Sequence, residues 1–193
     1  MRLTLLAAAL SLLVGCGREL PAPAEPPTQP TPTPAADSSI ASPPATLDAA
    51  IPAELIATRL ELAHAPRYNA AGDSLDLTVR IHNDGQATLV GQGAAMVNLG
   101  AMLVGPEGPD APPGLRDFVR APLPLMAPGT QAEVAISLPA EPLLGLPVRL
   151  ELVQEGVNWF SAYGQPSLDI GLFQRCDATP GTLCTEDGQA LAP

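Results

Sequence analysis

The 193-residue sequence contains no lysine, and all nine of its basic residues are arginines. Its 20 acidic residues set the formal net charge at −11. A negative chain without a basic cluster argues against binding of nucleic acid and against electrostatic binding to anionic lipid. Aromatic residues make up only 3% of the chain, so a broad stacking platform for sugars or bases is hard to build.

Sequence motifs of common catalytic and cofactor sites are also missing. There is no G-x-S-x-G, H-E-x-x-H, P-loop or dinucleotide-binding fingerprint. His64 and His82 are the only histidines, and neither has a Cys, Asp or Glu at metal-ligand spacing. The acidic turns at Asp84 and at Glu186-Asp187 lack the spaced ligands of a calcium loop. We therefore expect a protein that is not an enzyme and that has no cofactor and no metal site.

The N-terminal apolar run is too short to remain as a membrane span. Arg2 precedes an apolar stretch from Leu3 to Val14 that only Thr4 and Ser11 interrupt. A basic start, a short apolar stretch and a small-residue end predict a secretory signal over residues 1–15. A spanning helix needs roughly 20 apolar residues.

The end of this signal is more specific. Leu13-Val14-Gly15-Cys16 resembles the lipobox of bacterial lipoproteins. The resemblance implies cleavage before Cys16, acylation of its thiol and amine, and stable membrane anchoring by more than one acyl chain. Gly17, where retained lipoproteins have Asp, implies a lipid-anchored protein of the cell envelope at the outer membrane, on its periplasmic or its surface side. The alternatives are an ordinary cleaved signal with a chance cysteine, or an uncleaved span.

Lipidation of Cys16 would leave two of the three cysteines, Cys176 and Cys184. These two can pair as a disulfide, which suits an exported, oxidising location. Their C-x7-C spacing has no companion Cys or His, so it does not predict a zinc site.

Residues 16–53 form the lipidated cysteine and a Pro/Ala-rich linker. Ten prolines lie between Pro21 and Pro52, and large aliphatic residues are few. Such a composition cannot bury enough surface to offset the entropy of ordering, so it predicts a disordered segment with polyproline II character. The segment is either a spacer that lifts a domain off the membrane or a generic linker.

From about residue 54 onward, apolar residues alternate with polar ones at strand spacing. Turn signals rich in Pro, Gly and Asn separate seven or eight such runs. Half-buried alternation on every strand predicts an all-β fold, an immunoglobulin-like antiparallel β-sandwich over residues 54–173. Residues 174–193 are expected to form a polar C-terminal tail. The predicted strands lie near residues 56–62, 75–82, 97–103, 117–123, 132–138, 146–152, 159–160 and 168–172.

Several motifs of this region occur together in order. They are Val97-x-Leu99-Gly100-Ala101-x-Leu103, Arg120–Pro124, Ala127-Pro128-Gly129 and the run from Glu151 to Phe160. Together they resemble a bacterial immunoglobulin-like β-sandwich module that occurs in envelope proteins and is appended to glycosyltransferase-type and other surface-polysaccharide-related proteins. The resemblance implies an accessory module without catalysis. Here no catalytic domain accompanies the module.

The strongest candidate binding site lies in and just after the last of these motifs. Aromatic faces there can stack on sugar rings, with acidic and amide side chains as hydrogen-bond partners. Alternatively, Trp159 or Phe160 fills the sandwich core and Glu155-Gly156 forms a turn, and we favour this second interpretation. Arg116 and Arg120 can bind an anionic glycan, but we expect them to pair with Asp117 and Glu side chains. The candidate binding residues are Glu155, Asn158, Trp159, Phe160 and Tyr163.

We therefore expect a non-catalytic, lipid-anchored envelope protein whose sandwich is an interaction module for a protein or a glycan. The alternative is a structural or assembly lipoprotein that supports surface-polysaccharide or other envelope machinery. The expected partners are the membrane, through the N-terminal lipid, and an envelope protein or glycan, with no nucleic acid. Sandwich edges can bind partners by strand addition, but the sequence does not identify which edge is open.

Overall fold

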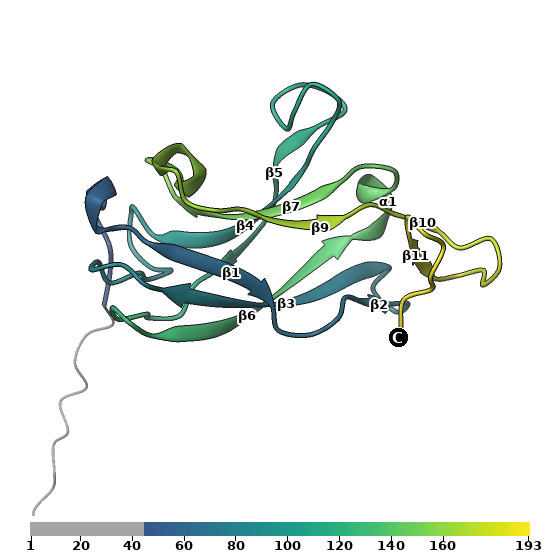
Figure 1. The fold of residues 1–193 in the computed structure, drawn as a ribbon, viewed down its shortest axis with the longest axis horizontal. Coiled ribbons are helices and arrows are strands. Elements are labelled where there is room, and N and C mark those ends of the chain that lie inside the picture. Colours follow the sequence, from purple (N-terminus) through teal and green to yellow (C-terminus); the bar gives the residue numbers. More distant parts are fainter. Residues whose placement is uncertain (1–44) are drawn as a thin grey trace, which may run out of the picture. The chain divides into compact units, whose positions relative to one another are not determined.

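The computed structural model describes residues 45–193, so Cys16, the predicted signal and most of the predicted linker lie outside the described part. This part is mostly β, with two antiparallel sheets packed together and few helices, which confirms that level of the predicted fold (Figure 1). The strands are β1 (Thr58–Leu62), β2 (Arg67–Asn69), β3 (Ser74–Asn83), β4 (Val97–Leu103), β5 (Leu115–Pro122), β6 (Gln131–Pro139), β7 (Val148–Gln154), β8 (Asn158–Trp159), β9 (Leu168–Gly171), β10 (Phe173–Arg175) and β11 (Leu183–Thr185).

Strand β3 is the centre of the first sheet. It pairs with β1 and β2 along one edge and with β6 along the other. In the second sheet β4 lies between β5 and β7, and both β8 and β9 pair with β7. The short helices are η1 (Ala53–Leu55), α1 (Ala140–Leu143) and η2 (Phe160–Tyr163). Within residues 45–193, no helix has the length and apolar character needed to cross a membrane.

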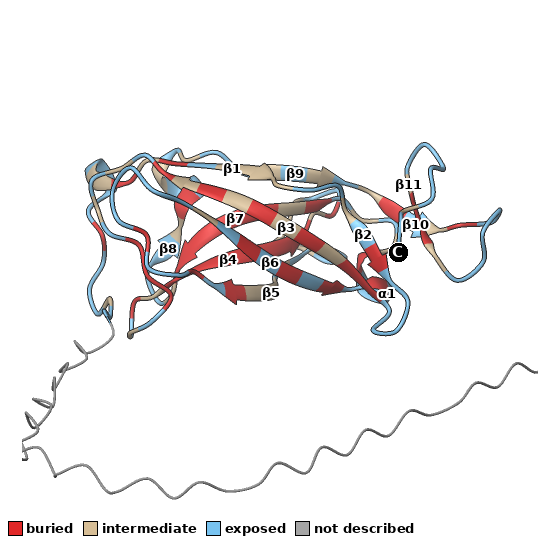
Figure 2. Ribbon diagram, turned by 90° about the horizontal axis from the view of Figure 1, so that it is seen from below, coloured by how far each residue is buried: buried red, intermediate tan, exposed pale blue. Residues whose placement is uncertain are grey.

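The core lies between the two sheets, as the buried residues on facing strands show (Figure 2). The alternation in β3 places Leu75, Leu77, Val79 and Ile81 inside, while the residues between them lie on the outer face. In β4 and β7 the inner positions are also apolar except for Gln154, but the outer positions apart from Arg149 are buried as well. Other parts of the chain therefore cover the outer face of β4 and β7 in the second sheet.

The packed region begins before residue 54. Leu47 donates its N–H to Gln92 O at 2.8 Å and accepts from Ala95 N at 2.8 Å. Ile51 is buried in the core. The side chain of Gln154 accepts from Ile51 N at 3.0 Å and donates to Ala49 O at 2.9 Å. These contacts place residues 47–53, expected in the linker, against the sandwich.

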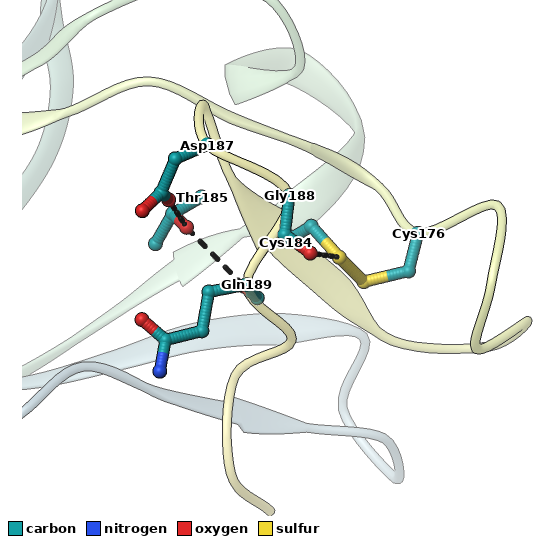
Figure 3. The surroundings of a disulfide bond; sticks show 6 residues. All are labelled: Cys176, Cys184, Thr185, Asp187, Gly188 and Gln189. Atoms are coloured by element: carbon teal, nitrogen blue, oxygen red, sulfur yellow. Dashed lines mark hydrogen bonds between the residues drawn. A yellow bond between two sulfur atoms is a disulfide. The ribbon is translucent and has the colours of Figure 1, made fainter.

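The C-terminal region forms a hairpin of β10 and β11. The predicted Cys176–Cys184 disulfide is present, with 5.1 Å between the Cα atoms (Figure 3). Beyond it, the Thr185 hydroxyl donates to Asp187 and closes the turn before Gln189. Phe173 and Leu183 lie in the core, so this region carries a hydrophobic anchor in addition to its polar surface.

Candidate functional site

The candidate site lies on the outer face of the second sheet, where the β7–β8 turn returns the chain to the sheet. Gly156 has a φ of 67°, a left-handed conformation that glycine adopts without strain and that lets the chain reverse between the two strands. Trp159 then pairs with Val153 on the outer side. The next side chain, Phe160, points to the core and is only 1% exposed. The side chains of these two adjacent aromatic residues thus lie on opposite faces of the sheet.

The indole of Trp159 lies directly over Gly100 of β4. A Cβ atom at position 100 would stand 2.7 Å from Trp159 Cη2 and 2.6 Å from an Arg120 guanidinium nitrogen. Both distances are shorter than van der Waals contact. A glycine is therefore required for the indole and the guanidinium to approach the backbone here.

Two arginines from β5 lie against the indole. The guanidinium carbon of Arg120 is 4.2 Å from the ring centroid of Trp159, and that of Arg116 is 5.5 Å away. Such contacts stabilise both groups through the negative potential of the aromatic face. Because both of these contacts with the ring are made by charged groups, electrostatic as well as apolar interactions hold the Trp159 side chain in place.

Both arginines also pair with carboxylates, Arg120 with the expected Asp117 and a Glu, but Arg116 with Asp110 instead. Arg120 donates to Asp117 and, at 3.2 Å, to Glu155. Arg116 forms a bidentate ion pair with Asp110, in which one of the two hydrogen bonds is 2.6 Å long. The hydrogen bonds from Arg116, with a smaller coulombic contribution, lower the pKa of the Asp110 carboxyl. These pairs fix the guanidinium planes over Trp159.

The carboxylate of Glu155 connects two strands of the site. It accepts from Asn98 Nδ2 of β4 at 2.7 Å as well as from Arg120 Nε of β5. Three side-chain atoms nearby are buried and have no hydrogen-bond partner: Asn98 Oδ1, Arg120 Nη1 and Glu151 Oε2. Asn98 and Glu151 as whole residues are only 6% and 4% exposed. Within residues 45–193 one other side-chain atom, Thr58 Oγ1, is buried without a partner.

A buried polar atom without a partner costs about 1–3 kcal/mol, so native proteins rarely leave several together. Three of the four such atoms in residues 45–193 lie together on this face, around Trp159. Asn98, Glu151 and Arg120 flank Gly100 in the strand register, on the same outer face as Trp159.

The structure divides the predicted site residues into two groups. Glu155, Asn158 and Trp159 line a shallow hollow of ≈ 270 Å³ together with Asp117 and Arg120. The other two predicted residues, Phe160 and Tyr163, are not part of it. They pack against each other with ring centroids 6.4 Å apart, Phe160 in the core and Tyr163 beside it.

Sequence reasoning did not identify Asn98, Gly100 and Glu151 as parts of the site. Gly100 and Glu151 lie inside the motifs that carried the resemblance, but nothing in those motifs indicated that they face Trp159. A possible signal was the presence of polar residues at the outer positions of two strands whose inner positions are apolar. Their partners on other strands could only be recognised once the register was known.

The charged side chains of the site sum to a net negative charge. Four carboxylates (Asp110, Asp117, Glu151 and Glu155) face two guanidiniums (Arg116 and Arg120), which leaves a net charge of −2. Among residues 45–193 there is also no group of three or more His, Cys, Asp or Glu side chains that could hold a metal ion. The arrangement can supply hydrogen-bond donors and acceptors beside an aromatic ring.

Comparisons of this chain with known protein families, curated proteins and solved structures found no match.

Proposed function

We propose that this chain is a non-catalytic, lipid-anchored protein of the bacterial cell envelope whose β-sandwich is an interaction module for a protein or a glycan. The observation that carries the proposal is the half-buried indole of Trp159, which lies against the guanidinium groups of two arginines and lines an open hollow with Glu155 and Asn158. An interaction site of this kind combines an aromatic anchor with fixed polar groups, and Trp and Arg are the side chains that most often dominate binding energy.

The strand order supports an immunoglobulin-like sandwich. One sheet has β1, β3 and β6 side by side, and the other has β5, β4, β7 and β9. In chain order this corresponds to strands A, B and E facing strands C′, C, F and G of that fold. The arrangement is consistent with the resemblance to immunoglobulin-like envelope modules, which implies an accessory role.

The N-terminal sequence supports the location. The lipobox-like Leu13–Cys16 stretch implies a lipid anchor, and Gly17 favours the outer membrane. The absence of lysine leaves little basis for electrostatic attachment to anionic lipid. Attachment of the sandwich to the membrane would then depend on acylated Cys16. Replacing Cys16 by Ala should abolish incorporation of labelled fatty acid and release the protein from the membrane fraction.

The interaction itself is tested by enrichment from native envelope extract with the full-length protein. Trp159→Ala should lower the recovery of the bound component more than about tenfold, because aromatic anchors of this kind contribute 2 kcal/mol or more. Leu125→Ala is the matched control, since Leu125 is 59% exposed and lies outside the site. Thermal unfolding of both variants verifies that they are folded.

Two results would argue against the module. One is that the wild-type protein enriches nothing above background. The other is that folded Trp159→Ala and Leu125→Ala retain the same components equally well, which would place the interaction elsewhere on the protein.

A further inference from the structure

Strand β6 forms an edge of the first sheet, and within residues 45–193 its only strand partner is β3. The hydrogen bonds at both ends of this pair determine which backbone groups are used. Asn83 N donates to Thr130 O, and Ala140 N donates to Asp73 O, each at 2.9 Å. Opposed residues that bond directly alternate along an antiparallel pair, so the even-numbered residues of β6 bond to β3.

The odd-numbered residues of β6 therefore direct their N–H and C=O groups away from β3. These are Gln131, Glu133, Ala135 and Ser137, with Pro139 contributing only a carbonyl. In the part of the chain that the structure describes, none of these backbone groups makes a hydrogen bond. The side chains of these residues are exposed on the outer face of the sheet.

Two of the other sheet edges, those at β5 and β1, carry features with which natural proteins protect an edge. β5 contains a register shift opposite β4 and carries Arg116, Asp117 and Arg120. The beginning of the outer edge of β1 is covered by Gln165, which accepts from Thr58 N at 2.8 Å and donates to Ile56 O at 3.1 Å.

The β6 edge has little comparable protection. It has nine residues without a register shift, and its proline lies at the end. Its one charged residue, Glu133, is paired at 2.8 Å with Arg80 of the neighbouring strand β3, so the charge is already compensated within the sheet. A long, regular edge of this kind is a template for another strand.

We propose that β6 pairs antiparallel with β6 of a second copy of this chain, about a two-fold axis at Ala135. In this register Ala135 lies opposite Ala135, and Glu133 lies opposite Ser137 of the second copy. Each of these opposed residues can exchange both backbone hydrogen bonds with its partner, because all of them direct N–H and C=O outward.

A second copy fits this edge because the register is self-complementary, as a two-fold contact requires. Ala135 is small and the midpoint of the strand, so no side chain blocks the axis. Moving the axis to Glu133 would place two carboxylates opposite each other, which is unfavourable. A contact made mainly by one strand is small, so we expect a weak, concentration-dependent dimer.

Cysteine cross-linking tests the register on the full-length chain in detergent, with Cys16→Ser so that only the introduced thiol is free. Ala135→Cys should cross-link efficiently with a short bismaleimide. Thr78→Cys is the matched control, because Thr78 lies opposite Ala135 on the same outer face but one strand further from the edge. Equal cross-linking at the two positions would overturn the proposal, because it would indicate random collision.

Sedimentation of the full-length chain tests the strength of the contact. Ala135→Lys would place two like charges opposite each other at the axis, and the dimer dissociation constant should rise about tenfold or more. Thr78→Lys should leave it unchanged. A wild-type chain that stays monomeric at every concentration, or a dimer that Ala135→Lys does not weaken, would overturn the proposal.

The dimer is independent of the site around Trp159. Loss of ligand enrichment in Trp159→Ala should leave the cross-linking of Ala135→Cys unaffected. If Ala135→Lys instead removes a different bound protein while the wild-type chain remains monomeric, the β6 edge serves a foreign strand and self-association is wrong.

Discussion

Asp73 connects the C-terminal hairpin to the turn between β2 and β3. Its carboxylate accepts from Arg175 at 2.7 and 2.8 Å and from the Tyr68 hydroxyl at 2.7 Å. These hydrogen bonds, with that of Arg175 the strongest, lower the pKa of Asp73 to about 2. Asp73 also has a φ of 45°, which few non-glycine residues adopt. One side chain therefore couples a strained turn to a distant hairpin.

The depressed pKa of Asp73 predicts a dependence of stability on acid. A carboxyl group with a lower pKa in the folded state stabilises that state above its unfolded pKa of about 3.8, and the contribution disappears as the pH falls toward about 2. Asp73→Asn should lower the stability at pH 7 and reduce its loss between about pH 4 and pH 2.

Urea unfolding of the full-length chain at several pH values measures this effect. Asp177→Asn is the matched control, since Asp177 is an exposed carboxylate close to the same hairpin. If the stability profiles of Asp73→Asn and Asp177→Asn coincide across this pH range, the Arg175–Asp73 contact does not contribute to stability.

Single residues also show where the sequence ceases to be informative. The sequence predicted the turn at Glu155-Gly156, and it predicted that either Trp159 or Phe160 lies in the core. The choice of Phe160 for the core, with Trp159 on the outer face, depends on Gly100, which leaves space for the indole. That neighbour belongs to a strand nearly 60 positions away, and no local pattern contains its position.

Gln154 of β7 shows how a single buried amide can organise an irregular segment. Its side chain is fully buried and bonds to Ile51 N, Ala49 O and Ala95 O at 2.9–3.0 Å. Among residues 45–193, no strand pairs with the segment around Ile51. We infer that Gln154 supplies the backbone hydrogen bonds that a sheet would otherwise supply.

Gln154→Leu should therefore destabilise the protein by about 3 kcal/mol, because the backbone groups of Ile51 and Ala95 that lose their partner remain buried. Urea unfolding measures the total, and hydrogen exchange of the Ile51 amide locates the effect. Gln174→Leu on the exposed side of β10 is the control. Slow exchange at Ile51 in Gln154→Leu would mean that another group replaces the amide.

The longer strands were predictable because each has enough residues to show alternation. β3 and β6 have ten and nine residues, and their predicted positions differ from the structure by a residue at either end. β2, β10 and β11 have three residues each, which is too short for any period to be recognised. These short strands form because of their tertiary neighbours. β2 pairs with β3, and β10 and β11 pair with each other in the disulfide-closed hairpin.

The disulfide contributes to the stability of the whole molecule through the unfolded chain. Cys176 and Cys184 are separated by eight positions, and closing so short a loop stabilises the folded state by about 2.5 kcal/mol. The double variant Cys176→Ser, Cys184→Ser should lose about this amount in urea unfolding. It should keep the same fold, because Phe173 and Leu183 still anchor the hairpin in the core.

A near-ultraviolet spectrum of Trp159 provides the control for the rest of the sandwich and should be unchanged. If the double variant unfolds completely at 25 °C, the hairpin is essential to the sandwich and is more than an appended element. If it loses no stability, the unfolded chain is already restricted by other means.

At the level of the molecule, composition and periodicity were sufficient to predict two packed antiparallel sheets. They were not sufficient to define where the packed region begins, because Leu47 and Ile51 are isolated apolar residues in a sequence of Pro, Ala and Thr. Their burial depends on Gln92, Ala95 and Gln154, which lie far along the chain. Contacts between distant segments carry no local signature.

The way in which the N-terminal segment enters the sandwich has a mechanical consequence. A pulling force on the chain ahead of Leu47 would be borne first by the bonds to Gln92 and Ala95, and then by the amide of Gln154. Gln154 is the residue before Glu155, which holds Arg120 and Asn98 beside Trp159. Tension on the segment would thus reach a residue one covalent step from Glu155, so that load on the N-terminal segment would be carried by the end of β7.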